Sequence, residues 1–349
     1  MEEAATATAD VTVRQVTTHP SIHHHPFFFV DAWDAEMRFL VFLSHRSGRP
    51  QIWIELQDGG TLVQLTDVPD PAEWSAIPSK DGEWIHFVAG QAGKRVSTRT
   101  GEVETLVNFG TAEMREADMV GAAMGTTALS ASGRNWAVPV KTGPVSRFWM
   151  IDTVEGGAEV FLERDTIGHP QSCPDDDDLI LFAGPLTDRV WITDRAGNER
   201  RLYRREHGMP RITHEVWRPG HRSVLFVDWP NGNGEIDVET GAARRLSDFP
   251  VWHAAPDAGG RFAVADTSFP DRGLHILDLE TGAARFLHRS EAFSAGAHWA
   301  YPFPYNDGPI EVYAPQHTHP HPRFSPDGRH VVFTSDRSGH PQVYVATLS

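Results

Sequence analysis

The chain contains a single cysteine, Cys173, among 349 residues, so no disulfide can form within it. It also lacks an apolar run of the ~18 residues that a transmembrane helix needs. Its first residues, Met1-Glu-Glu-Ala-Ala-Thr6, have neither the positive charge nor the apolar core of a signal peptide. Together these absences predict a cytoplasmic protein whose stability comes from an ordinary hydrophobic core.

Basic residues are also scarce, since 31 Lys and Arg stand against 47 Asp and Glu, a formal charge of −16. Nucleic acids and anionic membranes are bound through basic surfaces. From the acidic charge we therefore expect that the protein binds neither nucleic acid nor a membrane. What the chain does have is 19 histidines. With so little thiol, any bound metal would be held by imidazole nitrogen and oxygen.

Internal repeats predict the architecture. The segment from Ser325-Pro-Asp-Gly to Val345 has a near copy at residues 38–54, and five weaker copies lie between them. Each copy consists of short β-rich runs separated by Gly, Pro and Asp, which is typical of antiparallel hairpins. A period of about 40 residues without helical periodicity predicts an all-β, seven-bladed β-propeller.

The two ends of the chain are expected to share one blade. The last repeat stops at Ser349 without its final strand, and residues 11–17 supply an alternating stretch of the right kind. Joining them removes an exposed sheet edge. We therefore expect the N-terminal strand to close the last blade, residues 1–10 to form a disordered tail and residues 11–349 to form one propeller domain.

Several histidines recur at one position of the repeat. Three lie five residues before a turn proline, and a fourth lies three before it: His169, His214, His321 and His253. His23, His24 and His25 enter the first repeat in the same way. Since the first strand of each blade lines the central channel, these imidazoles are expected to converge at one mouth.

The densest group is Gln316-His-Thr-His-Pro-His-Pro322. Alternation along a strand places His319 and His321 on one face, within reach of Gln316 and of His253 from the neighbouring blade. Three imidazoles and an amide oxygen are a neutral ligand set that leaves a divalent ion free to bind an anion. The alternative is a group of structural histidines in a polar loop.

Other residues are given weaker assignments. Arg189 opens a strand 25 residues before His214, and Glu215 is expected to point to the opposite face of its strand from His214. Residues 175–178, four aspartates, are expected to form a solvated hairpin turn. The remaining histidines in strands and turns receive no function: His45, His86 and His340.

On these residues the chain resembles the oligogalacturonate lyases. The specific features are Gln-x-x-His-x-His followed by Pro322 and an aromatic residue, the stretch His214-Glu-Val-Trp217, and Arg189-Val-Trp191 at a strand start. The Ser-Pro-Asp-Gly repeats are shared more widely with TolB-type propellers and indicate the fold only.

The resemblance implies a cytoplasmic seven-bladed propeller of pectin degradation that cleaves small acidic oligosaccharides by β-elimination. It also implies a manganese ion held by His253, Gln316, His319 and His321, with His214 as the base and Arg189 as the essential arginine. Three imidazoles suit zinc, iron or nickel equally well. Manganese therefore follows from the resemblance and not from the ligand types.

β-Elimination from a uronate removes the C5 proton beside the C6 carboxylate and expels the C4 oxygen. A cation on that carboxylate stabilises the negative charge that develops, and imidazole is a suitable base near neutral pH. Arg189 would stabilise the same charge. We also expect His169 to contact substrate, together with Tyr301 from the insertion that spans residues 290–315.

Two alternatives remain at this stage. The chain could be a non-catalytic, TolB-like propeller that binds a protein or peptide at its channel. It could also use the metal for isomerisation or hydrolysis of another carboxylated sugar, because the fold does not determine the reaction.

Overall fold

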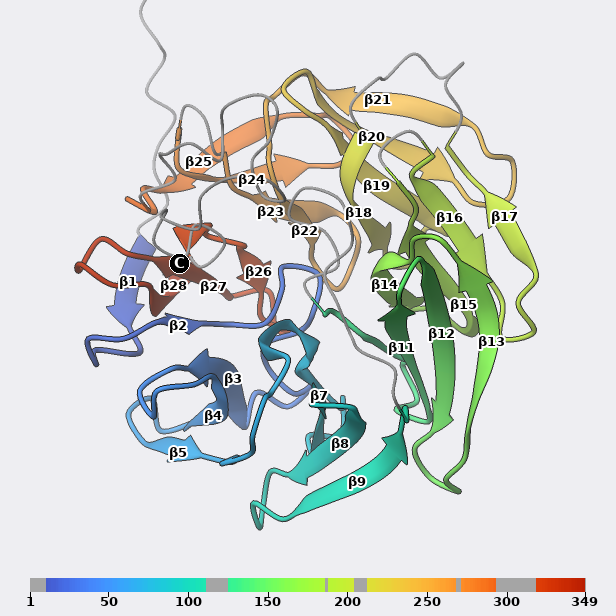
Figure 1. Cartoon of the computed structure of the whole chain (residues 1–349). Helices are drawn as coiled ribbons and strands as arrows, with labels where there is room; N and C mark the ends of the chain where they lie inside the picture. The colour runs from blue at the N-terminus through green and yellow to red at the C-terminus, as the bar shows by residue number, and fades with distance from the viewer. Residues whose placement is uncertain are drawn as a thin grey trace, which may run out of the picture.

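Short strands joined by tight turns build seven four-stranded antiparallel sheets in the described part of the chain, arranged as blades around a central channel (Figure 1). The computed structural model describes residues 11–110, 125–185, 188–203, 212–267, 271–292 and 318–348. The predicted seven-bladed β-propeller is confirmed.

The strands of each blade are named here in order from the channel outward. Blade 1 holds β2 (His23–His24), β3 (Phe39–Ser44), β4 (Gln51–Leu56) and β5 (Leu62–Gln64). Blade 2 follows the 3-10 helix η1 (Glu73–Ser75) and holds β6 (Ile77–Pro78), β7 (Trp84–Ala89), β8 (Ala92–Ser97) and β9 (Val103–Asn108). Blade 3 holds β10 (Ala128–Leu129), β11 (Asn135–Thr142), β12 (Val145–Asp152) and β13 (Ala158–Arg164). Blade 4 holds β14 (Gly168–Cys173), β15 (Asp176–Ala183), β16 (Val190–Thr193) and β17 (Glu199–Arg201).

The last three blades follow the same plan. Blade 5 holds β18 (Ile212–Arg218), β19 (Ser223–Asp228), β20 (Gly232–Asp237) and β21 (Ala243–Ser247). Blade 6 holds β22 (Ala254–Pro256), β23 (Phe262–Ala265), β24 (Leu274–Asp278) and β25 (Ala284–His288). Blade 7 holds β26 (Arg323–Phe324), β27 (His330–Ser335), β28 (Gln342–Leu348) and β1 (Val11–Gln15).

The chain ends meet in blade 7, as predicted. Strand β1 pairs antiparallel with β28, from Val11 opposite Leu348 to Gln15 opposite Tyr344. The contact continues one residue further, where the Val16 amide donates to the Val343 carbonyl at 2.8 Å. The N-terminal strand thus covers the edge of β28 and completes the ring.

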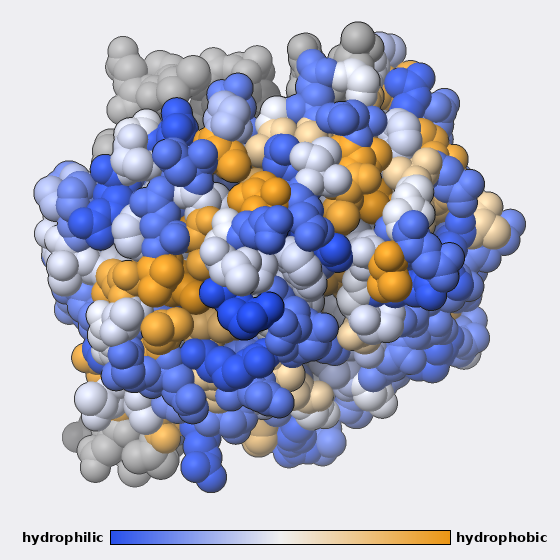
Figure 2. Space-filling view, turned by 90° about the horizontal axis from the view of Figure 1, so that it is seen from below, coloured by the Kyte–Doolittle hydropathy of each residue, from blue (hydrophilic) through white to orange (hydrophobic). Residues whose placement is uncertain are grey.

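The apolar core lies between neighbouring blades, because each strand turns alternate side chains to opposite faces of its sheet. One cluster joins blades 1 and 2, another joins blades 4 and 5, and the broadest joins blades 5, 6 and 7. Seen from below, the outer surface is mostly hydrophilic with small apolar groups between the polar residues (Figure 2). None of the described residues form a helix long and apolar enough to cross a membrane.

Candidate metal centre and active site

Three of the predicted metal ligands converge at one mouth of the channel. His253 precedes β22, while His319 and His321 precede β26 of the next blade. One ring nitrogen from each lies within 4.8 Å of the other two, and all three side chains are buried. The ring centroids of His253 and His321 are 4.3 Å apart. This triangle of imidazoles is small enough to surround a single ion.

A buried carboxylate, Asp266, orients the triangle. His253 Nδ1 lies 2.8 Å from Asp266 Oδ2, and because a carboxylate only accepts, Nδ1 carries the proton and Nε2 keeps its lone pair. The same aspartate accepts the backbone N–H groups of His253 at 2.7 Å and His321 at 3.2 Å. Asp266 therefore fixes one imidazole and links two blades, as carboxylates behind metal-binding histidines commonly do.

The proposed base, His214, borders this triangle. Its ring centroid lies 4.3 Å from that of His253 and 4.6 Å from that of Trp252. Burial lowers the pKa of His214 well below its usual value, and the neighbouring His253, His169 and Arg189 lower it further. The imidazole is consequently neutral, with a lone pair to accept a proton.

Arg189 completes the other side of the site. It is among the largest fully buried side chains of the described residues. Its Nε donates to Glu215 Oε1 at 2.7 Å, and its Nη2 lies 3.2 Å from His169 Nδ1. A buried guanidinium is stable only beside a counter-charge, which Glu215 supplies. An arginine at the start of a strand is usually exposed to solvent. Arg189 is instead part of a buried polar network.

The backbone departs from regular geometry at these histidines. His169, His214 and His321 have φ angles of 47°, 50° and 47°, in the left-handed region that residues other than glycine rarely adopt. The β14–β15 and β18–β19 ladders slip in register around the first two. Such bulges redirect side chains, and backbone strain of this kind is typical of functional sites.

The side chains of His214 and Glu215 meet different neighbouring blades. His214 packs against His253 at the start of blade 6, whereas Glu215, 2% exposed, is bound to Arg189 of blade 4. The two neighbours in sequence therefore serve different parts of the site, and the backbone bulges between Thr213 and Val216. Asp266 was not predicted from the sequence, although its position directly after the apolar strand β23 is a signal for a buried carboxylate. Gln316 and Tyr301 lie outside the described residues.

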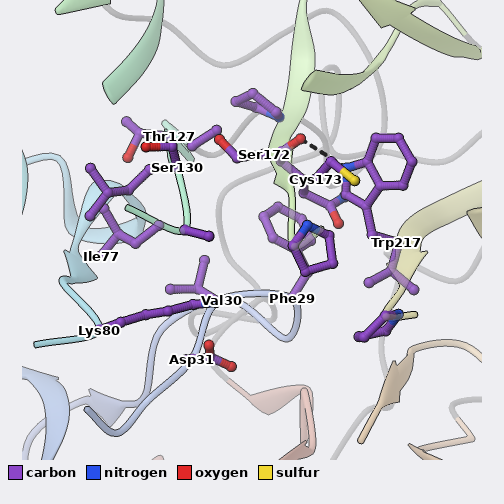
Figure 3. Close-up of a pocket in the computed structure, with 18 of the residues that line it drawn as sticks. Phe29, Val30, Asp31, Ile77, Lys80, Thr127, Ser130, Ser172, Cys173 and Trp217 are labelled. Carbon is purple, nitrogen blue, oxygen red and sulfur yellow. Dashed lines mark hydrogen bonds between the residues drawn. The ribbon is translucent and has the colours of Figure 1, made fainter. Parts of the chain in front are cut away.

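The phenylalanines of the segment 27–29 pack against the imidazoles of the site. Phe27 packs against His321 at 4.9 Å and His169 at 5.3 Å, and Phe28 packs against His253 at 4.9 Å between ring centroids. Beyond Phe29, a cavity of about 130 Å³ is lined by the first strands of blades 2 to 7 (Figure 3). Trp217, on its wall, donates to the Gln171 carbonyl at 3.0 Å. The three imidazoles of the triangle are not among the residues that line this cavity.

Comparison with known sequences gives a consistent result. The family model described as oligogalacturonate lyase matches residues 135–349. An oligogalacturonate lyase of Dickeya dadantii (strain 3937) is 29% identical over 236 residues, or 59% of this chain and 56% of that protein. An oligogalacturonide lyase of Pectobacterium atrosepticum is 30% identical over 233 residues, with the same two coverages of 59% and 56%. The match thus spans a little over half the length of these curated relatives.

Solved structures share the fold. An oligogalacturonate lyase in complex with manganese superposes with a TM-score of 0.82 at 22% identity, over 98% of this chain and 94% of that one. An oligogalacturonate lyase from Vibrio parahaemolyticus superposes with a TM-score of 0.79 at 20% identity, over 98% of both chains. At this identity the likeness concerns the fold.

Proposed function

Because the chain belongs to the oligogalacturonate lyase family, we propose that it cleaves short uronic-acid oligosaccharides of the oligogalacturonate type by β-elimination. The observation that carries this proposal is the contact between the candidate metal-binding imidazoles and the candidate base, His214. Three buried imidazoles able to hold a cation lie against a neutral, buried His214, and Arg189 lies within the same network. A cation, a base and a fixed positive charge are what removal of a proton beside a carboxylate requires.

The chain's donors fit a divalent metal ion. His253 presents a lone pair at Nε2 because Asp266 holds the proton on Nδ1, and His319 and His321 bring ring nitrogens to the same place. We propose His253, His319 and His321 as ligands, with Gln316 as the fourth. When bound, the ion would neutralise the substrate's C6 carboxylate and so acidify the C5 proton. Manganese is the choice suggested by the solved relative whose title names it.

His214 is the proposed base. Its buried Nδ1 has no hydrogen-bond partner in the described part of the chain. The Trp252 backbone favours the protonated ring, but burial outweighs this effect and lowers the pKa of His214. One nitrogen of the neutral imidazole carries a lone pair, and we propose that this lone pair accepts the C5 proton. The lowered pKa keeps the base unprotonated at neutral pH.

Arg189 is proposed to stabilise the negative charge that develops as the proton leaves. Glu215 holds its Nε, so the guanidinium cannot rotate away from the site. His169 contacts the same guanidinium and is proposed to bind substrate, as is Tyr301. The proposed location remains the cytoplasm, which rests on the single cysteine.

Product analysis distinguishes the three candidate functions. Purified protein loaded with Mn²⁺ is incubated with digalacturonate, and the products are identified by mass spectrometry. Elimination gives one saturated monomer and one monomer lighter by a water molecule. Two saturated monomers would indicate hydrolysis, and a rearranged dimer of unchanged mass would indicate isomerisation. Unaltered substrate across several uronates, with no metal bound, would favour a non-catalytic binding propeller.

A further inference from the structure

A second group of metal-ligating side chains lies between blades 1 and 2. His24 comes from the inner strand β2, His45 directly follows β3, and Glu73 begins η1. One ligand atom from each lies within 4.8 Å of the other two. No function was predicted from the sequence for His45 or Glu73. None of the three belongs to the imidazole triangle described above.

Both imidazoles lie close to the same carboxylate oxygen. Glu73 Oε2 lies 2.6 Å from His45 Nε2 and 3.3 Å from His24 Nε2. His24 Nδ1 lies 2.9 Å from the His25 carbonyl, which can only accept, so Nδ1 carries the proton of the neutral ring. In the neutral ring, the lone pair of His24 Nε2 faces the same Glu73 oxygen that His45 Nε2 contacts. A divalent cation shared by the three atoms fits this arrangement.

The spacing suits a small divalent ion. In a tetrahedral site with ligands at about 2.1 Å, neighbouring ligand atoms are roughly 3.4 Å apart. The separation of His24 Nε2 from Glu73 Oε2 is already 3.3 Å. The hydrogen bond between His45 and Glu73 would have to open by less than 1 Å. Two imidazoles and one carboxylate form the ligand set of many zinc sites with open positions.

The group is accessible and separate from the first centre. The side chains of His45 and Glu73 are 22% and 19% exposed, whereas that of His24 is 1% exposed. Trp74 stands between the two groups, with its ring 4.0 Å from His24 and 5.7 Å from His321. An ion here would thus have one buried ligand, two ligands at the surface and room for water or an anion.

We propose that His24, His45 and Glu73 form a second divalent-metal site, with a preference for zinc-like ions, at the same mouth of the channel as the imidazole triangle. His24 belongs to the inner strand β2, and Ser44, which precedes His45, pairs with His23 at the start of that strand. Glu73 lies in η1, just before the inner strand β6. The proposal concerns metal binding alone and does not depend on the reaction that the protein catalyses.

Metal counting tests the proposal. Protein without an affinity tag is stripped with a chelator, equilibrated with Zn²⁺, desalted and analysed for zinc per chain by mass spectrometry. We expect two ions in the wild type and one in His319→Ala/His321→Ala. His45→Gln/Glu73→Gln should also retain one, and the combination of all four substitutions should retain none. Circular dichroism of each variant establishes that it is folded.

A matched control is His330→Gln. His330 lies 3.4 Å from Asp327, but this pair belongs to no three-ligand group among the described residues. Its substitution should leave the zinc count unchanged. The proposal is overturned if folded His45→Gln/Glu73→Gln binds as much zinc as the wild type. If the wild type binds one ion and this variant none, the second site stands and the imidazole triangle fails as a metal centre.

Discussion

At the scale of single residues, two buried carboxylates organise the site. Asp266 fixes the tautomer of His253 and accepts the His321 amide, while Glu215 neutralises and orients Arg189. Each carboxylate holds a group from a different segment, so loss of either would disturb geometry as well as charge. The candidate ligands and the candidate base therefore depend on residues that do not themselves carry the chemistry.

Replacing His214 should separate base from ligand. His214→Ala is expected to lower kcat by about 10²- to 10⁴-fold, because a general base contributes that much. The metal content should stay at the wild-type value, whereas His319→Ala should lose metal and activity together. Metal analysis and product absorbance on the same samples provide the measurement. Loss of metal from His214→Ala would mean that base and ligand had been confused.

Replacing Glu215 tests the positioning of Arg189. Glu215→Gln removes the counter-charge of a buried guanidinium, so we expect a loss of roughly 3 kcal/mol in stability. Kinetically, kcat should fall about 100-fold, since a small displacement of a catalytic group has that effect. The measurements are denaturant unfolding and kcat of the folded variant.

The matched control is Glu235→Gln in the same blade. Glu235 accepts from the buried Arg218 at 2.9 Å but lies on the third strand, away from the channel. Its loss should destabilise the protein similarly and leave kcat of the folded fraction unchanged. Equal kcat values for the two variants would show that Glu215 has a structural role only.

At the scale of strands, irregular backbone positions the chemistry. The bulges in β14 and β18 place His169 and His214 in left-handed conformations, and His321 adopts the same conformation before β26. The repeat register predicted that these histidines reach one mouth. The irregularity itself was not predictable, because a bulge depends on the pairing of two strands and leaves no mark in local alternation.

The repeat pattern predicted the positions of some site residues and not of others. The convergence of His253, His319 and His321 followed from the position of each histidine in its repeat. The pairing of Glu215 with Arg189 did not, since it depends on which residues of blades 4 and 5 face each other, and the repeat pattern contains no such information. The pairing of His24 and His45 with Glu73 depends on a short helix between two blades, for which the repeat pattern gave no indication.

Strand β7 offers a test of pH dependence. His86 is buried against Trp136, neither of its ring nitrogens has a partner among the described residues, and burial lowers its pKa to about 3. Its usual pKa of 6.5 applies when the chain is unfolded. Protonation therefore favours the unfolded state as the pH falls below 6.5, by about 2 kcal/mol at pH 5.

His86→Phe removes this contribution. The variant should show a smaller loss of unfolding free energy between pH 8 and pH 5 than the wild type, because an apolar ring of similar shape replaces unpaired nitrogens. Urea unfolding at several pH values measures this change in the free energy of unfolding. Parallel pH profiles for the two proteins would contradict the account.

At the scale of the whole molecule, the ring is closed by non-covalent pairing of its ends. The β1–β28 ladder joins residues more than 300 positions apart and leaves the last blade without an open edge. Blades 6 and 7, which carry the imidazole triangle, are joined by the hydrogen bond from the His321 amide to Asp266. The proposed metal centre therefore lies between the blade that closes the ring and its neighbour.

Removing the closing strand should weaken the entire protein. Deletion of residues 1–17 exposes the edge of β28, and we expect Tm to fall by at least about 5 °C and aggregation to increase. Deletion of residues 1–10, predicted to be a disordered tail, is the control and should leave Tm unchanged. Thermal unfolding followed by circular dichroism decides between them, and equal Tm values for the two deletions would contradict the role of β1.

The most direct test of the central claim follows the ultraviolet absorbance of the unsaturated product from digalacturonate, with bound metal counted in the same samples. We expect no product from chelator-stripped protein, restored production after addition of Mn²⁺, and no production from metal-loaded His214→Ala. If metal-loaded wild-type protein forms no unsaturated product from digalacturonate or related uronates, the protein is not a lyase of this kind.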